Sequence, residues 1–350
     1  MTSVAEIYTH VIGVDTHART HTFTIVAAAT AAVIANQTFP ATQTGLTRAL
    51  AWVHRNSAST RLMVVEGIGS YGALLTARAA SQGVEVVEPD PIPVGVKRGK
   101  GKTDVLDSVR IARSVLGSDT SHLRRPRSDG GIRDALQVLT VAREGQTGEK
   151  TRAVNQLIAL TRTTNLGVDA SKGLTITQIR GIARWLTRDE PLCVAVARAQ
   201  AVYLARRILE LKTLIKDNET QIRVIIRSGP YSGLLDLFGF GPVTAAAVIV
   251  AWGNPGRAQG EARFAALAGV NPIPVCSGNT TSHRLNRGGD RRLNKALTVV
   301  IRVRMLRDEE TIIYTERRTK QGMTKRSITR MLKRYLAREV YHVLKAITVG

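Results

Sequence analysis

The chain has 350 residues, of which 43% are hydrophobic, and it carries a formal net charge of +23. This length suggests more than one domain, and the excess of positive charge favours polyanionic partners, nucleic acids first. Two cysteines are too few for a disulfide framework or a zinc site. No apolar run reaches the roughly 18 residues of a membrane-spanning helix, and the N-terminal sequence lacks the pattern of a secretory signal. We therefore expect a cytoplasmic protein with no membrane partner.

The first 125 residues alternate between predicted strands and predicted helices. Residues 8–40 contain three runs rich in β-branched residues that are joined by short turns, which predicts an antiparallel meander. The elements expected after the meander are, in chain order, a helix at 44–56, a strand at 61–67, a helix at 71–83, a strand at 84–90 and a helix from Asp104 to about Leu116 that Thr103 caps. Strands that alternate with helices predict parallel crossovers and an α/β layer fold. This is the element order of ribonuclease H-like domains.

Residues 130–228 are predicted to be mostly helical. From Ala201 to Ile225, apolar residues alternate spacings of three and four, which is a heptad seam. Asn218 lies on this seam, where a polar residue fixes the register at some cost in stability. The seam predicts a coiled coil between subunits or, equally compatible with the pattern, a helix bundle within one subunit.

The remaining residues have a third character. Residues 234–253 are predicted to form a helix, a tight turn at Gly239 and Gly241, and a second helix. This pattern is typical of a helix-hairpin-helix, whose free amides can meet a phosphate, and also of an ordinary helix pair. A loop rich in Gly, Asn, Ser and Thr is expected over 269–290, followed by two basic helices at 291–307 and 324–346. The predicted domains are therefore 1–125, 126–228 and 229–350.

Four carboxylates stand out in the first domain. Asp15 closes the first predicted strand and Glu66 closes the fourth, whereas Asp104 and Asp107 share one face of a helix. Acids at the ends of apolar strands are costly to bury unless they are paired or bind a metal ion. Hard cations such as Mg²⁺ prefer oxygen ligands of this kind. The alternative for the helical pair is that both acids only favour the helix N-terminus through its dipole. Basic residues that could attract the DNA backbone precede the helix, namely Lys97, Arg98, Lys100 and Lys102.

The segments around these acids carry a resemblance. The blocks are "GVDTHART" around Asp15, "VVEGIGSYG" around Glu66, and "KTDVLDSVRIA" around Asp104 and Asp107. They resemble three blocks of the IS110 family of insertion-sequence transposases, recombinases with an N-terminal RuvC-like domain whose acidic quartet is written D-E-D-D. The resemblance places this quartet on Asp15, Glu66, Asp104 and Asp107. It implies that all four are catalytic residues that hold Mg²⁺ or Mn²⁺.

The predicted loop over 269–290 contains two possible nucleophiles. Chemistry alone does not distinguish the hydroxyl of Ser277 from other loop hydroxyls, and Cys276 is an equal candidate by reactivity. However, "FAALAGVNP" before Ser277-Gly278 and "RGGDRRLNKAL" after it resemble the transposase domain of the same family, which implies that Ser277 is the catalytic nucleophile. The intervening "NTTSHRLN" is less basic than the resemblance leads one to expect. Arginines that could neutralise the scissile phosphate follow, namely Arg284, Arg287, Arg291 and Arg292.

The resemblance also implies an activity and its partners. Members of the family excise and insert their element by recombining DNA, guided by a structured noncoding RNA, the bridge RNA, that pairs with target and donor DNA. The serine forms a covalent phosphoserine link, and the working assembly is a tetramer of two dimers in the prokaryotic cytoplasm, at the nucleoid when acting. Two alternatives remain. A metal-only RuvC-like nuclease, such as a junction resolvase, needs the quartet but not Ser277, and a nucleic-acid scaffold needs neither.

Overall fold

The computed structural model describes residues 2–89, 103–126, 131–253, 258, 260–277, 280–286 and 288–349. For residues 274–283, 285, 348 and 349, the description does not extend to the side chains. The chain divides into two compact units, Met1–Asp129 with Trp252–Leu267, and Gly130–Ala251 with Ala268–Gly350. We describe each unit by itself.

The first unit is built on one five-stranded sheet in the order β3-β2-β1-β4-β5. The strands are β1 (His10–Thr16), β2 (Thr20–Ala27), β3 (Val33–Pro40), β4 (Arg61–Val65) and β5 (Glu85–Val87). The first three form the predicted antiparallel meander, and β4 and β5 add to it in parallel. The predicted mixed α/β arrangement with parallel crossovers is confirmed.

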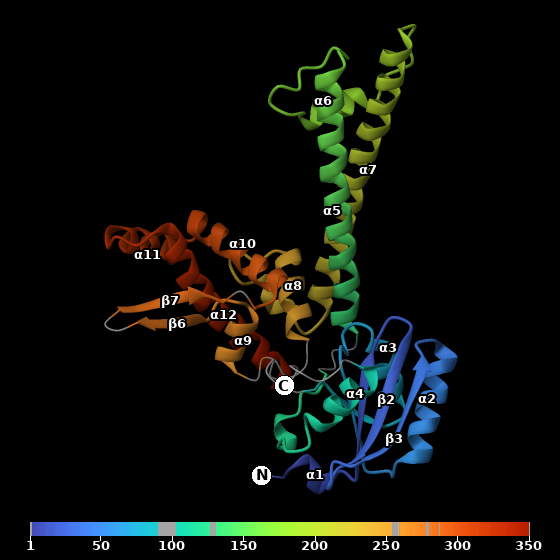
Figure 1. Ribbon diagram of the computed structural model, residues 1–350. Helices are drawn as coiled ribbons and strands as arrows, with labels where there is room; N and C mark the ends of the chain where they lie inside the picture. The colour runs from blue at the N-terminus through green and yellow to red at the C-terminus, as the bar shows by residue number, and fades with distance from the viewer. Residues whose placement is uncertain are drawn as a thin grey trace. The chain divides into compact units, whose positions relative to one another are not determined.

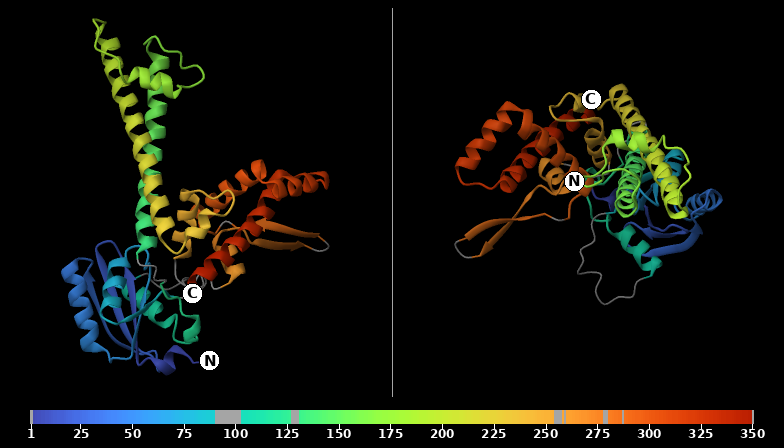
Figure 2. Two further views of the ribbon diagram at one scale, coloured as in Figure 1. Left: turned by 180° about the vertical axis from the view of Figure 1, so that it is seen from behind. Right: turned by 90° about the horizontal axis from the view of Figure 1, so that it is seen from above.

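Helices cover both faces of this sheet (Figures 1 and 2). The helices of the first unit are α1 (Val4–Ile7), α2 (Gln43–Asn56), α3 (Ala73–Ser81), α4 (Asp104–Arg113) and α9 (Glu261–Leu267), with a 3₁₀ turn, η2 (Thr120–His122). Strand side chains alternate between the faces. Those on one face pack against α2 and α3, and those on the other face pack against α4. The predicted cap of α4 is confirmed, because the Thr103 hydroxyl accepts a hydrogen bond from the Leu106 amide at 3.3 Å. The helix ends at Arg113, before the expected Leu116.

Helix α4 lies unusually close to the sheet. At Gly13 on β1, a Cβ atom would stand only 2.1 Å from the Ser108 carbonyl oxygen and 2.5 Å from the Ala112 amide. Beside this contact the buried hydroxyls of Thr24 and Ser108 share a 2.7 Å hydrogen bond between β2 and α4. Small residues on both elements therefore set the position of the helix that carries Asp104 and Asp107.

The second unit begins with a long helical hairpin (Figure 1). Its helices are α5 (Ile132–Thr163), α6 (Ile176–Ile182) and α7 (Leu192–Ser228). The heptad seam of α7 packs against α5 of the same chain, with Leu211 fully buried and the Asn218 side-chain amide donating to the Leu139 carbonyl at 3.0 Å. Of the two alternatives that the sequence left open, the structure therefore contains a helix pair within one subunit.

The rest of the second unit departs from the sequence prediction at three places. Its elements are η3 (Ser232–Leu235), α8 (Pro242–Trp252), β6 (Pro272–Ser277), β7 (Thr280–Leu285), α10 (Arg291–Arg307), α11 (Glu309–Lys320) and α12 (Lys325–Val349). The expected loop at 269–290 contains an antiparallel pair, β6 and β7. The prediction missed this pair because the Gly and Asn content of the segment was taken to indicate a loop. The β-branched runs on either side of Gly278-Asn279, together with that dipeptide, are a hairpin signal. The first predicted helix before Gly239 is only a 3₁₀ turn, and α11 was not predicted.

In the part of the chain that the structure describes, no helix combines the length and apolarity needed to cross a membrane.

Candidate metal centre and nucleic-acid-binding residues

Asp15 and Glu66 lie side by side because of strand register. Val14 of β1 pairs with Val65 of the parallel strand β4, and the Glu66 amide continues this ladder by donating to the Val14 carbonyl at 3.1 Å. Asp15 and Glu66 directly follow this pair, Asp15 on β1 and Glu66 immediately after β4. Alternation directs Asp15 to the face that α4 covers, as it does for Gly13. The sequence prediction that two strand ends present acids near α4 is consistent with this register.

Three side chains bring possible metal-binding atoms together at this point. Asp15 is buried, whereas His17 and Asp104 are exposed, and one donor atom from each lies within 4.8 Å of the other two. His17 Nε2 is 3.2 Å from Asp15 Oδ2 and 3.6 Å from Asp104 Oδ1. The N-terminus of α4 thus delivers Asp104 to the end of β1, and His17 bridges the two carboxylates.

The surroundings of Asp15 disfavour its ionised form. Burial raises the pKa of Asp15 above its usual value, the charge of His17 opposes this, and the charges of Asp104 and Asp107 raise the pKa further. Desolvation and repulsion between carboxylates both disfavour the ionised form. A bound cation would relieve both effects, so the electrostatics of these residues fit a metal site.

The other two members of the predicted quartet are placed differently. Asp107 is close enough to affect Asp15, but its Oδ1 accepts a 2.9 Å hydrogen bond from Arg110 Nη1. Glu66 adjoins Asp15 by strand register, and its backbone carbonyl accepts a 2.8 Å bond from the Thr16 hydroxyl. Among the described residues, neither carboxylate belongs to the group of mutually close donor atoms. The structure therefore brings together Asp15 and Asp104, with Asp107 and Glu66 adjacent.

His17 is the residue that sequence reasoning missed. It follows Asp15 by two positions, so it lies on the same side of the chain when the strand is extended. Imidazole is a common metal ligand, and an Asp-x-His spacing at a strand end would have been a usable signal. The two carboxylates suit Mg²⁺ and Mn²⁺ alike, whereas the imidazole of His17 is a ligand that a transition-metal ion such as Mn²⁺ accepts more readily than Mg²⁺.

The predicted nucleophile lies on the β6–β7 hairpin of the second unit. Ser277 is the last residue of β6 and pairs with Thr280 on β7, and Cys276 pairs with Thr281. The side chains of Ser277 and Cys276 lie outside the described residues, as does Gly278.

The predicted nucleic-acid contacts fall into three groups. Lys97, Arg98, Lys100, Lys102 and Arg287 lie outside the described residues. Arg284 and Arg291 are exposed, and Arg292, also exposed, forms a 2.8 Å ion pair with Glu144 on α5. Gly239 has a positive φ of 84°, which fits the predicted tight turn. The Gly241 amide donates to the Thr244 hydroxyl at 2.9 Å, so this predicted phosphate donor is already used within the chain.

A five-stranded α/β unit with an acidic cluster beside its central strand, followed by mostly helical sequence, is consistent with a DEDD-type transposase. A family model for such transposases matches residues 12–165, which include all four predicted acids. A second model, described as "Transposase IS116/IS110/IS902 family", matches residues 231–315, which include Ser277. A relative from Streptomyces clavuligerus, described as an uncharacterized 44.8 kDa protein of insertion element IS116, is 26% identical over 275 residues, 65% of this chain and 67% of the relative.

The chain belongs to the IS110 family of insertion-sequence transposases. The family implies DNA as substrate and the cleavage and rejoining of DNA strands as the activity.

Proposed function

We propose that this transposase excises and inserts its mobile element through metal-assisted attack of Ser277 on a DNA phosphate, guided by a structured bridge RNA. The observation that carries the metal part is the convergence of Asp15, His17 and Asp104 within 4.8 Å. The family membership and the position of Ser277 at the end of β6 support the serine part.

Asp15, Glu66, Asp104 and Asp107 would hold Mg²⁺ or Mn²⁺, with His17 as a further ligand. When bound, such a cation stabilises charge on a phosphate and on the attacking or leaving oxygen. The role of the protein is to hold the acids close together despite their repulsion. Packing of α4 against Gly13 supports this role, because it fixes the helix that carries Asp104 and Asp107.

In the proposed chemical step, Ser277 Oγ forms a bond to the phosphorus of the DNA backbone as one phosphorus–oxygen bond of the strand breaks. The serine hydroxyl gives up one proton and the leaving oxygen gains one, so that the broken strand ends in a free hydroxyl and no net proton is consumed. The phosphoserine ester conserves the energy of the phosphodiester. A hydroxyl of a new strand then attacks the same phosphorus, and Ser277 is released without any need for ATP.

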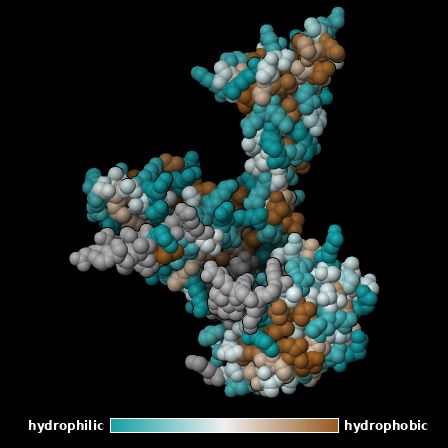
Figure 3. Space-filling model, viewed as in Figure 1, coloured by the Kyte–Doolittle hydropathy of each residue, from teal (hydrophilic) through white to brown (hydrophobic). Residues whose placement is uncertain are grey.

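The proposed assembly is a tetramer of two dimers that binds donor DNA, target DNA and the RNA. The net charge of +23 supports polyanionic partners. Figure 3 shows hydrophobic surface at the end of the helical hairpin. Large apolar side chains are exposed just before and at the start of α7, namely Leu186, Leu192 and Val196. Exposed apolar surface of this kind supports contacts with another subunit.

The division of labour that we propose follows three segments. Residues 1–125 would form the RuvC-like metal domain, residues 126–228 the helical oligomerisation region, and residues 229–350 the transposase domain, which contains Ser277 and the turn at Gly239 before α8. The turn at Gly239 would approach the DNA backbone.

The metal site is tested by conservative substitutions. Asp15→Asn and Asp104→Asn should abolish recombination and weaken Mn²⁺ binding measured by calorimetry, because each removes a charged ligand but keeps the side-chain volume. The exposed Asp189 provides the matched control, and Asp189→Asn should leave both properties unchanged. Glu66→Gln and Asp107→Asn should also abolish recombination. Full recombination in excess chelator would refute the metal proposal.

The serine is tested by trapping a covalent adduct. Ser277→Ala should bind DNA and RNA normally yet form no adduct with a nicked substrate, whereas Cys276→Ala should form the adduct and remain active. Mass spectrometry should locate the nucleotide on Ser277. Strand cleavage by Ser277→Ala would instead favour the metal-only nuclease.

A further inference from the structure

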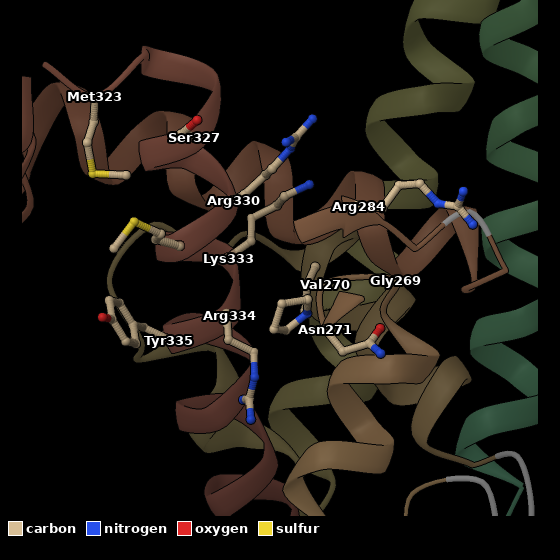
Figure 4. Close-up of a pocket in the computed structure, with 12 residues that line it drawn as sticks. Gly269, Val270, Asn271, Arg284, Met323, Ser327, Arg330, Lys333, Arg334 and Tyr335 are labelled. Atoms are coloured by element: carbon tan, nitrogen blue, oxygen red, sulfur yellow. The ribbon is translucent and has the colours of Figure 1, made fainter. Parts of the chain in front are cut away.

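A cavity of about 450 Å³ lies within the second unit, between α12 and the start of the β6–β7 hairpin (Figure 4). This volume is within the range of roughly 300–1,000 Å³ typical of pockets that accept small molecules. Of the described residues that line it, none is acidic and four are cationic, namely Arg284, Arg330, Lys333 and Arg334. We call this cavity the Lys333 pocket. Its charge indicates an anionic ligand.

Lys333 is the most informative of these residues because it is buried. Its side chain is only 9% exposed. Its Nζ donates to Asn294 Oδ1 at 3.1 Å and to the Thr298 hydroxyl at 3.4 Å, both neutral acceptors on α10. An ammonium group has three donors, and a buried charge without an opposite charge is costly. Because these two described partners are neutral, an anion that enters the pocket would supply a negative charge that they do not.

Arg330 makes the burial of the Lys333 charge still less favourable. It lies one helical turn before Lys333, so both side chains leave the same face of α12, and Figure 4 shows them extending in the same direction. Burial lowers the pKa of Lys333, and the charge of Arg330 lowers it further. Two neighbouring cations at the wall of a cavity can both donate charge-assisted hydrogen bonds to one phosphate, which would also offset their mutual repulsion.

The rest of the lining suits a nucleotide. Tyr335 is 51% exposed, and its ring is held edge-on by the Tyr314 ring at a centroid distance of 6.2 Å. Val270, Pro272 and Met331 supply apolar walls. Figure 4 shows Tyr335 on the opposite side of α12 from Arg330 and Lys333. A half-exposed aromatic ring and cations that line the same pocket suit a single strand, because an unstacked base can pack on the ring while phosphates of that strand meet the charges. In a duplex the bases remain stacked on each other.

We infer that the Lys333 pocket binds single-stranded nucleic acid, with a backbone phosphate against Arg330 and Lys333 and a base of the same strand on Tyr335, across α12. The inference rests on the proposed function, since it gives the transposase domain a defined contact with a displaced DNA strand or an unpaired RNA segment. A DNA strand and an RNA strand present the same phosphodiester chemistry, and the experiment below distinguishes which of the two the pocket binds.

The test compares Lys333→Met with Lys320→Met by fluorescence anisotropy. The probes are labelled thymidine and uridine oligonucleotides, and the same DNA as a duplex. Lys320 is an exposed lysine on α11 outside the pocket, so its variant removes the same charge. Loss of a hydrogen-bonded charge at a phosphate should weaken single-strand binding roughly tenfold for Lys333→Met, with a much smaller effect for Lys320→Met and for the duplex. Loss with DNA, with RNA or with both identifies the strand that the pocket takes.

Thermal stability separates a binding lysine from a structural one. Lys333→Met removes a buried charge that lacks an opposite charge among its hydrogen-bond partners, so its melting temperature should equal or exceed that of the wild type. A clear fall in melting temperature would indicate a structural lysine. In that case the variant Arg330→Gln provides the test, because Arg330 is exposed and its replacement does not disturb the core. Wild-type affinity of this variant for the single strand would overturn the proposal.

A third variant tests the base contact. Tyr335→Leu should weaken binding of the thymidine strand roughly tenfold but leave binding of an abasic strand unchanged, whereas Lys333→Met should weaken both. Equal losses for Lys333→Met and Lys320→Met would overturn the inference. The assay needs neither metal nor Ser277, so its failure would leave recombination and adduct formation as separate tests of the proposed function.

Discussion

Gly13 should be the position at which a single methyl group disrupts the metal centre most strongly. In Gly13→Ala the new Cβ would lie 2.1 Å from the Ser108 carbonyl oxygen, 2.5 Å from the Ala112 amide and 2.8 Å from the Ala112 Cβ, where ordinary contacts begin near 3.4 Å. Two of these atoms belong to the backbone of α4, so rotation of a side chain cannot relieve the clash. The helix must move by about 1 Å to restore normal separations.

The expected cost is at the upper end for an overpacked core, about 3 kcal/mol. For a unit of this size, such a loss lowers the melting temperature by roughly 10 °C. The effect on metal binding should be larger than the effect on folding, because metal–ligand distances tolerate shifts of only about 0.2 Å. Asp104 and Asp107 would move with the helix, whereas Asp15 stays on β1.

The assay is differential scanning calorimetry together with Mn²⁺ titration of the folded protein. Gly117→Ala is the matched control, since it makes the same substitution in the same unit at a position where a Cβ meets no described atom within 4 Å. It should melt and bind metal like the wild type. If Gly13→Ala behaves like this control, the close approach of α4 does not position the acids and our reasoning about the site is wrong.

Three further predictions concern the core, the hairpin and the charged surface. Burial lowers the pKa of His21 in the folded protein, so the unfolded chain binds a proton on this residue more tightly. The free energy of unfolding should therefore fall as the pH drops below about 6.5. Denaturant titrations should show a weaker pH dependence of this free energy in His21→Gln. Asn218 Oδ1 is buried without a partner among the described residues, so Asn218→Leu should raise the stability of the hairpin by about 1 kcal/mol, and a lower melting temperature would contradict this. Binding to duplex DNA should weaken steeply with salt, by a log–log slope of roughly −0.9 for each neutralised phosphate, and a flat profile would exclude the basic surface as the binding face.

Much of the first unit could be predicted from the sequence because its signals are local. Alternating β-branched residues gave the strands, and Thr103 before Asp104 gave the start of α4, since both patterns depend on neighbours within a few positions. The acids at strand ends were visible for the same reason. Local signals also misled, as at 269–290, where turn-forming residues hid the strands β6 and β7.

Tertiary structure alone decided which groups meet. The Asp-x-His spacing places His17 near Asp15, but only the fold shows that His17 also reaches Asp104, because that contact depends on how α4 crosses β1. The heptad seam was clear in the sequence, but only the fold supplied α5 as its partner, since an apolar stripe specifies burial and not the identity of the surface that buries it. In the sequence, Lys333 is one of many cations on a basic helix. Its burial results from the packing of α12 against α10, a helix from an earlier part of the chain. Periodicity is a property of neighbouring residues, whereas desolvation and convergence are properties of the assembled fold.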